Sequence, residues 1–384
     1  MKITRRCFFS ALFYLLATLP AFPQSPNQKF LVFVGTYTDK TDSKGIYAYE
    51  FDAATGKLTP RGLAAETSNP SWVVIHPNGK WAYAANESGK QSSISAFSID
   101  AKSVKLTLLN HLPALGEDPC YLSFDKTGKY LFVANYTSGN VVVFPILPDG
   151  KLGTPTANVK DQGTVGPNKE RQEGPHAHWV QPATDNRFVL VSDLGFDEIL
   201  VFRFDDDKGT LTPNDPPFAK LAPGNGPRHA TFSTNGKILY VMSELNPGVT
   251  VLSYDSRKGL LKSIQDNSGH TKDNFSGRDD GAEIALHPDG KWMFTSVRGP
   301  DFISVHTFEP GAMGKLFLDR SFATGGKEPR HFAIDPTGRF LLAENQNSNS
   351  IVVFRINPET GALSKVSIAE GVPSPVCLGF FPRH

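Results

Sequence analysis

One sequence pattern recurs six times along the chain and constrains the fold more than any other feature. Each copy contains an apolar run, a tight turn of the Pro-Asp-Gly-Lys type and a second apolar run. Asn, Asp and Gly dominate the turns because they tolerate the positive φ that tight hairpins require. A period of about 50 residues with such a core is typical of a β-propeller. The copies, with their central turn residues, are 69–87 (Gly79), 118–136 (Gly128), 175–194 (Asn186), 226–245 (Gly236), 280–299 (Gly290) and 328–346 (Gly338).

Each copy continues into a third apolar run and a shorter fourth one. We therefore expect four antiparallel strands per unit, which is one propeller blade. The fourth strand carries a Gly-x-Leu sequence, as at Gly209 and Gly361. The predicted third strands are 93–100, 140–147, 198–205, 248–255, 303–310 and 350–358.

The two ends of the chain supply a seventh blade. Residues 30–58 have the pattern of the last three strands of a blade without its first, and residues 374–381 that of a first strand with nothing after it. If the C-terminal strand joins the N-terminal blade, the ring closes and the exposed sheet edges that a linear array of blades would carry are removed. We predict an all-β fold, a single seven-bladed β-propeller of four-stranded blades over residues 25–384.

The first 24 residues have the pattern of a signal peptide. Arg5 and Arg6 precede the apolar run Ala11–Leu19, which is short for a membrane span. The paired arginines followed by two phenylalanines favour a twin-arginine signal, and an ordinary secretory signal is the alternative. Either route predicts a periplasmic or secreted protein that has no contact with the membrane in its mature form.

Charge and cysteine content narrow the classes of partner and cofactor. The formal net charge is +1, and loss of Lys2, Arg5 and Arg6 with the signal would bring it to −2, so nucleic acid is not an expected partner. Cys120 and Cys377 fall on first strands of non-adjacent blades, so we expect buried, unpaired thiols. No cysteine–histidine spacing of the zinc type occurs, and we expect neither a metal nor another cofactor. A monomer is expected.

The register of the repeat predicts which residues meet at one mouth of the ring. The start of each first strand and the end of each second strand lie on the same face, near the central channel. Strand starts and loop tips on a rigid scaffold are where functional residues concentrate. The residues eight positions before the turn residues are Ser71, Cys120, His178, Arg228, Ala282 and Arg330, those eight after are Glu87, Tyr136, Leu194, Glu244, Arg298 and Gln346, and those flanking them are His176, His229, Glu283, His331, Asp193 and Asn345.

The residue types in this set can support hydrolysis by water. Two arginines can bind a carboxylate or phosphate or stabilise an oxyanion, and a histidine or glutamate can activate water as a general base. The chain has no Gly-x-Ser-x-Gly nucleophile elbow, so direct attack of water on an ester or lactone carbonyl fits better than an acyl-enzyme. The alternative is structural: these side chains would only solvate the rim or tie neighbouring blades together.

Several segments resemble the seven-bladed propeller lactonases of the bacterial 6-phosphogluconolactonase type. The resemblance extends from Val34 to Phe381, and its most specific piece is GPNKERQEGPHAH at 166–178. It implies a hydrolase that opens a sugar-acid lactone without a cofactor. The other similar stretches are DNRFVLVSDLGFDEILVF, GPRHATFSTNGKILYVMSEL, AEIALHPDGKWMFTSVRGPDFISV and EPRHFAIDPTGRFLLAENQNSNSIVVFRINPETGAL.

The same family includes fungal muconate-lactonising enzymes, and their motifs imply which residues act here. Arg228 and Arg298 would hold the anionic group or the oxyanion, and Glu244 or a histidine would deprotonate water. Val297 departs from the family pattern, which usually has Asn before the second arginine. The candidate catalytic residues are His176, His178, Arg228, Glu244 and Arg298, and the candidate substrate-binding residues are His229, Glu283, Arg330 and Asn345.

Two other functions stay open on the sequence. A muconate-type cycloisomerase would use the same residues in the lactone-forming direction, and a periplasmic binding propeller would use them without catalysis. The export signal bears on the substrate, because a phosphorylated sugar lactone is a cytoplasmic intermediate. An exported enzyme would instead meet an unphosphorylated sugar lactone.

Overall fold

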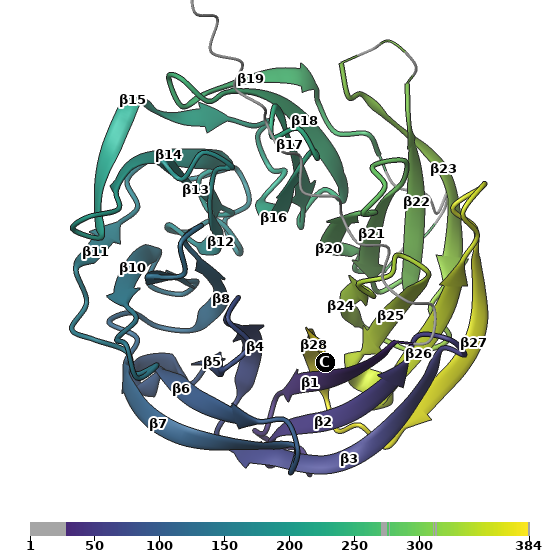
Figure 1. Cartoon of the computed structure of the whole chain (residues 1–384). Coiled ribbons are helices and arrows are strands. Elements are labelled where there is room, and N and C mark those ends of the chain that lie inside the picture. The colour runs from purple at the N-terminus through teal and green to yellow at the C-terminus, as the bar shows by residue number, and fades with distance from the viewer. Residues whose placement is uncertain (1–27, 270–274, 276, 310, 312, 383–384) are drawn as a thin grey trace, which may run out of the picture.

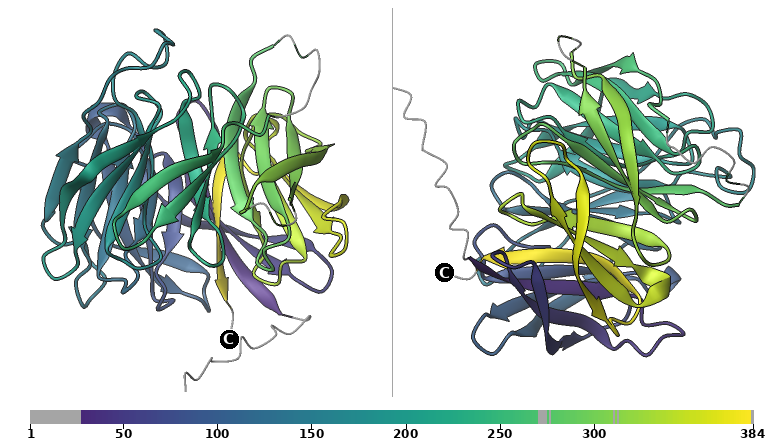
Figure 2. Two further views of the ribbon diagram at one scale, coloured as in Figure 1. Left: turned by 90° about the horizontal axis from the view of Figure 1, so that it is seen from above. Right: turned by 90° about the vertical axis from the view of Figure 1, so that its right-hand side faces the viewer.

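The computed structural model describes residues 28–269, 275, 277–309, 311 and 313–382, and the predicted signal peptide lies outside them. In the described part, 28 strands form seven four-stranded antiparallel sheets. The sheets are arranged as blades around a common centre (Figure 1), and side views show a thick ring (Figure 2). The predicted seven-bladed architecture is confirmed. No helix of the described part is long and apolar enough to cross a membrane.

Within every blade the four strands are ordered from the centre of the ring outwards (Figure 1). The innermost strands are β28 (Pro375–Pro382), β4 (Pro70–Ile75), β8 (Pro119–Phe124), β12 (Ala177–Pro182), β16 (Pro227–Phe232), β20 (Asp280–Leu286) and β24 (Pro329–Ile334). The second strands are β1 (Lys29–Thr36), β5 (Trp81–Asn86), β9 (Tyr130–Asn135), β13 (Phe188–Asp193), β17 (Ile238–Ser243), β21 (Met293–Arg298) and β25 (Phe340–Asn345).

The outer half of each blade consists of a third and a fourth strand. The third strands are β2 (Gly45–Asp52), β6 (Ser93–Asp100), β10 (Asn140–Pro145), β14 (Glu198–Asp205), β18 (Gly248–Asp255), β22 (Phe302–Phe308) and β26 (Ser350–Ile356). The fourth strands are β3 (Lys57–Glu66), β7 (Lys105–Pro113), β11 (Ala157–Lys160), β15 (Thr210–Lys220), β19 (Leu260–Gln265), β23 (Leu316–Ala323) and β27 (Leu363–Glu370). Short 3₁₀ turns follow β5 (η1, Gly89–Gln91) and β25 (η2, Gln346–Ser348).

The turn between the first and second strands has the backbone conformation that its residue types predict. The central residue has a φ between 60° and 75° in all six repeats, including the non-glycine Asn186 at 60°. At Gly128 a side chain would in addition come within 2.8 Å of Nε2 of His76 in the neighbouring blade. Glycine at this position therefore allows both the turn and the close approach of two blades.

The expectation of a shorter fourth strand is wrong for most blades. β15 has 11 residues and β3 has 10, whereas β11 has four. The long fourth strands keep pairing with the third strand beyond a register irregularity, as between Leu200 and Phe202 in β14. A bulge lets the outer strand bend without ending the ladder.

The C-terminal strand closes the ring as predicted. β28 pairs antiparallel with β1, with Val32 opposite Phe380 and Val34 opposite Leu378. Phe51 of the closing blade packs edge-on against Phe340 of the preceding blade, with ring centroids 5.5 Å apart. The apolar core consists of such contacts between neighbouring blades, so the closing blade is buried on both faces.

Candidate active site

A register irregularity at the start of every first strand positions the polar residues of the site. Ala177 and Trp179 pair with Asp193 and Ser192, so His178 between them is left out of the ladder. Such a bulge bends the strand and redirects the unpaired side chain. The residues left out are Ser71, Cys120, His178, Arg228 with His229, Ala282 with Glu283, Arg330 and, in the closing blade, Val376.

A cavity of about 250 Å³ lies where several of these residues meet. His178 and Arg330 are on first strands, Arg298 ends the second strand β21, and Glu87 and Glu244 directly follow second strands. The repeat register thus brings five residues from five blades to one site. The complete lining is Glu87, Cys120, Tyr136, Arg171, His178, Glu244, Arg278, Arg298 and Arg330.

Glu244 is the hub of an ion-pair network in the cavity wall. Its Oε2 accepts a hydrogen bond of 2.9 Å from Nε of Arg228 and lies 3.3 Å from Nη2 of Arg298. Its Oε1 accepts a hydrogen bond of 2.5 Å from Nη2 of Arg171. Arg228 does not line the cavity, because its side chain is buried behind Glu244 and also donates to the carbonyl oxygen of Ala282.

This network keeps Glu244 ionised. Burial alone would raise the pKa of its carboxyl, but Arg298, Arg228, His178 and Arg171 outweigh burial and hold the pKa well below its usual range. Burial and the neighbouring arginines lower the pKa of Arg228 to about 10, so the guanidinium still carries its charge at neutral pH. Glu244 is therefore a fixed counter-charge and a poor proton acceptor.

His178 lies in the cavity wall as a neutral imidazole. Its Nε2 is 3.7 Å from Oε2 of Glu244, and its Nδ1 is 3.7 Å from Sγ of Cys120. Burial, together with Arg228 and His229, lowers the pKa of His178 well below its ordinary value. Burial also raises the pKa of the Cys120 thiol, which is unpaired as predicted, so it is not a ready nucleophile.

Arg330 differs from the other cationic residues of the cavity. Arg278 and Arg298 pair with Asp280 and Glu328 beside the cavity, and Arg171 pairs with Glu244. Among the described residues, no carboxylate lies within ion-pair distance of Arg330. Its guanidinium instead lies 5.6 Å from the ring centroid of Tyr37. A half-buried cation without an ion-pair partner is a ready binding group for an anion.

The segment 161–176 supplies Arg171, which the repeat register did not predict. Asn168 shapes the segment by accepting hydrogen bonds from the backbone NH groups of Glu170 and Arg171 through its side chain. Gln172 is buried and donates to the carbonyl oxygen of Leu194. The segment passes close to Gly195, because a Cβ atom added at Gly195 would lie 1.7 Å from the carbonyl oxygen of Gly174. The stretch 166–178 therefore supplies two residues of the cavity lining, Arg171 and His178.

Like Arg228, the candidate residues His176 and Asn345 lie outside the cavity lining. The ring of His176 stacks on Tyr136, and its nitrogens contact the carbonyl oxygen of Tyr136 and the carboxylate of Glu173. Asn345, at the end of β25, is buried against Gly326. Neither side chain is placed to touch a molecule in the cavity.

The candidate binding residues His229 and Glu283 also lie outside the lining, at the centre of the ring. Nδ1 of His229 is 2.9 Å from Oε2 of Glu283, and Nε2 of His331 is 3.6 Å from the same oxygen. Trp72 contacts both imidazoles edge-on, at 5.3 and 5.2 Å between ring centroids. Side chains from β4, β16, β20 and β24 therefore fill the axis of the ring at this level. No group of His, Cys, Asp and Glu in the described part could hold a metal ion.

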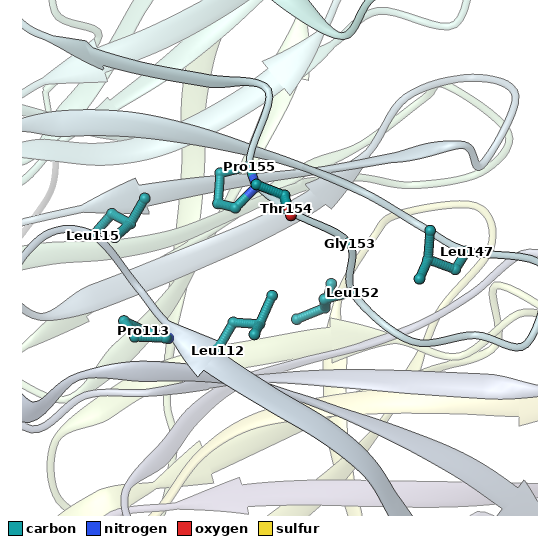
Figure 3. A pocket seen from close by; sticks show the side chains of 8 residues that line it. All are labelled: Leu112, Pro113, Leu115, Leu147, Leu152, Gly153, Thr154 and Pro155. Atoms are coloured by element: carbon teal, nitrogen blue, oxygen red, sulfur yellow. The ribbon is translucent and has the colours of Figure 1, made fainter.

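A second hollow, of about 480 Å³, lies beside the end of β7 and is apolar (Figure 3). No titratable side chain lines it, so it lacks the groups that hydrolysis requires. Its lining residues are Leu112, Pro113, Leu115, Leu147, Leu152, Gly153, Thr154 and Pro155.

Comparison with known proteins identifies close relatives of the chain. A family model described as "Lactonase, 7-bladed beta-propeller" matches residues 31–380. A 6-phosphogluconolactonase of Bacillus subtilis is 36% identical over 352 residues, which are 92% of this chain and 98% of that protein. A 6-phosphogluconolactonase of Formosa agariphila is 35% identical over 339 residues, which are 87% and 95% of the two chains.

Solved structures with the same fold include two that cover nearly all of the chain. The periplasmic gluconolactonase of Pseudomonas aeruginosa has a TM-score of 0.85 at 32% identity and covers 92% of this chain and 99% of that one. A Bacteroides fragilis protein has a TM-score of 0.85 at 36% identity, with coverage of 93% and 99%.

Proposed function

The chain belongs to the seven-bladed β-propeller lactonase family, and from this premise we propose that it hydrolyses an anionic or polyhydroxylated sugar-acid lactone in the arginine-lined cavity. Lactone hydrolysis itself follows from the family. The observation that carries the choice of site is Arg330, a half-buried cation in the cavity with no carboxylate partner among the described residues. An oxyanion, a carboxylate or a phosphate of the substrate would complete its coordination.

The size of the cavity suits a molecule of this class. Its volume of about 250 Å³ is just below the range of roughly 300–1,000 Å³ typical of pockets for drug-sized ligands. A monosaccharide-sized lactone is therefore a better match than a long acyl ester. The hydroxyl groups of a sugar acid would find donors and acceptors in Tyr136, His178 and Glu87, which line the cavity.

The arginines divide into two roles in this proposal. Arg298 and Arg330 line the cavity and would stabilise the negative charge that develops on the carbonyl oxygen or bind the anionic group of the substrate. Arg228 is a positioning residue, because it is buried behind Glu244 and acts through that carboxylate. Glu244 holds Arg171, Arg228 and Arg298 in place.

Each of the three residues that the sequence singled out as a base has surroundings that argue against that role. Glu244 is held ionised by its cations, and both ring nitrogens of His176 are engaged outside the cavity. His178 lines the cavity, but a positive charge on it would lie beside Arg228 in a buried site. None of the three is well suited to accept a proton from water.

The predicted export signal favours an unphosphorylated lactone as the physiological substrate. The Pseudomonas aeruginosa relative, which is named a periplasmic gluconolactonase, is consistent with this choice. The relatives named 6-phosphogluconolactonase support the phosphorylated lactone instead. We place glucono-δ-lactone first and its 6-phosphate second.

A pH-stat assay on the purified mature chain tests the proposal. Glucono-δ-lactone, its 6-phosphate and a muconolactone are supplied separately, and the spontaneous rate is subtracted at each pH. We expect acid release well above background with one of the two sugar lactones. Acceleration with muconolactone alone would support the cycloisomerase. A folded protein that binds gluconate without accelerating any hydrolysis would be a binding propeller.

A further inference from the structure

Three residues from three blades form a second constellation at the edge of the cavity. Tyr37 follows β1, Glu87 follows β5 and Arg330 is on β24. The hydroxyl of Tyr37 donates a hydrogen bond of 2.9 Å to Oε2 of Glu87. The guanidinium of Arg330 lies 5.6 Å from the centroid of the same tyrosine ring. One aromatic side chain thus contacts both a carboxylate and a cation of the cavity lining.

The backbone holds this constellation in place from both sides. The NH group of Glu87 donates to the carbonyl oxygen of Asn69 at 3.1 Å, and the NH group of Tyr37 donates to the carbonyl oxygen of Ser374 at 3.2 Å. Burial raises the pKa of the Tyr37 hydroxyl, so the group keeps its proton and can donate it to the hydrogen bond. Glu87 is therefore a fixed carboxylate and not a mobile rim residue.

Glu87 differs from Glu244 in the way a general base requires. Glu244 is within 4 Å of three arginines and of His178. Among the described residues, Glu87 has no ion pair, and Tyr37 is its one side-chain hydrogen-bond partner. It is half-buried and lines the cavity, so a substrate and a water molecule can reach it. A carboxylate without a fixed cation can accept a proton without breaking an ion pair.

We propose that Glu87 is the general base of the lactonase reaction and that Tyr37 is its positioning residue, an inference that rests on the proposed function. Glu87 takes a proton from water while the water oxygen bonds to the lactone carbonyl carbon. The carbonyl electron pair moves to oxygen, where Arg330 and Arg298 stabilise the negative charge. Collapse of this intermediate breaks the ring carbon–oxygen bond, and the proton on Glu87 passes to the departing alkoxide. The product is the open-chain hydroxy acid, and Glu87 is regenerated.

Glu87→Gln is the first test, because it keeps the shape of the side chain and removes its basicity. We expect kcat/KM to fall by about 10²–10⁴, the usual contribution of a general base. The fall in rate at acidic pH that reports protonation of the base should also disappear from the pH profile. Glu117→Gln is the matched control. Glu117 is half-buried, precedes β8 on the same face and does not line the cavity. It should retain the wild-type profile.

Tyr37→Phe is the second test and keeps the ring beneath Arg330. Loss of the donated hydrogen bond leaves the carboxylate of Glu87 without the side chain that orients it. We therefore expect kcat to fall by about tenfold while KM stays close to the wild-type value. Glu87→Asp, which keeps the carboxylate but moves it, serves in place of Glu87→Gln if the latter does not fold, and it should lower kcat at least tenfold with the acidic limb of the pH profile intact.

The outcomes separate this inference from the proposed function. If the wild-type chain shows no rate above background with any lactone, the proposed function fails. If the wild type is active but Glu87→Gln stays within threefold and keeps its acidic limb, the assignment of Glu87 as the base fails. An unchanged kcat in Tyr37→Phe would overturn the role of Tyr37 as the positioning residue of Glu87.

Discussion

Nε of Arg228 donates a 2.9 Å hydrogen bond to Oε2 of Glu244, and both side chains are almost completely buried. The two residues come from the same blade, but the same carboxylate also holds Arg171 and Arg298 from other parts of the ring. One negative charge thus organises three positive ones. Arg330 is not part of this arrangement and remains available to a substrate.

We predict that Glu244→Gln destabilises the fold and impairs activity. Removing Glu244 leaves the buried guanidinium of Arg228 without its ion-pair partner, and breaking a buried pair in this way typically costs about 3–5 kcal/mol. Urea unfolding measures this loss of stability. Activity should also fall, because Arg298 loses a carboxylate that holds it in place. Glu173→Gln is the control, because that side chain is 61% exposed and its one ion pair in the described part of the chain is with His176. A Glu244→Gln protein as stable as this control would contradict the prediction.

The free energy of unfolding should depend on pH through the carboxylate of Glu244. The folded-state pKa of Glu244 is lowered, so its contribution is present above the ordinary glutamate pKa of about 4.3 and is lost as pH falls through the lower folded value. The difference in unfolding free energy between wild type and Glu244→Gln should therefore shrink below about pH 4.3. Chemical denaturation at several pH values measures it. A difference that stays constant or grows on acidification would refute the assignment.

Closure of the ring predicts the effect of truncation. Deletion of residues 374–384 removes β28, exposes one edge of β1 and uncovers apolar core on both faces of the closing blade. We expect a clearly lower melting temperature and aggregation during heating, measured by calorimetry and light scattering. Deletion of residues 1–24, which precede the first strand, should leave the melting temperature unchanged. Equal melting temperatures for the two truncations would disprove the closure argument.

The two candidate histidines should behave differently on substitution. His178 lines the cavity, so His178→Asn should lower kcat/KM by about tenfold, the upper end of what one hydrogen bond between neutral groups contributes. His176 lies outside the lining, and His176→Asn should remain within about twofold of wild type. Steady-state kinetics on the preferred lactone decides this comparison. A larger loss for His176→Asn would reverse the placement of the two residues.

The repeat explains why so much of the fold could be predicted. A positive φ at each turn, a fixed distance from turn to strand end and two incomplete terminal units were enough to predict seven blades and a closed ring. The same register identified Glu87, Glu244 and Arg330, because strand ends on one face meet at the mouth. These predictions needed only local geometry that is repeated along the chain.

The rest of the site depends on features that the repeat does not encode. Arg171 and Arg278 lie on irregular segments outside the repeat, so no register applies to them. His176 and His178 would point the same way on a regular strand, but the bulge at His178 breaks the alternation and only His178 reaches the cavity. Asn345 comes one residue before the register position, which is Gln346, and its side chain lies against Gly326. Such details depend on tertiary packing.

Hydrolysis of glucono-δ-lactone by wild type and by Arg330→Ala, followed in a pH-stat at matched protein stability, is the sharpest test of lactone hydrolysis in the arginine-lined cavity. The wild type should accelerate ring opening, and Arg330→Ala should lose about 10²–10³ of the rate, equal to about 2.7–4 kcal/mol of transition-state stabilisation. Folding of both proteins is checked by circular dichroism. Equal rates for the two folded proteins, or no acceleration of any sugar lactone by the wild type, would contradict lactone hydrolysis in this cavity.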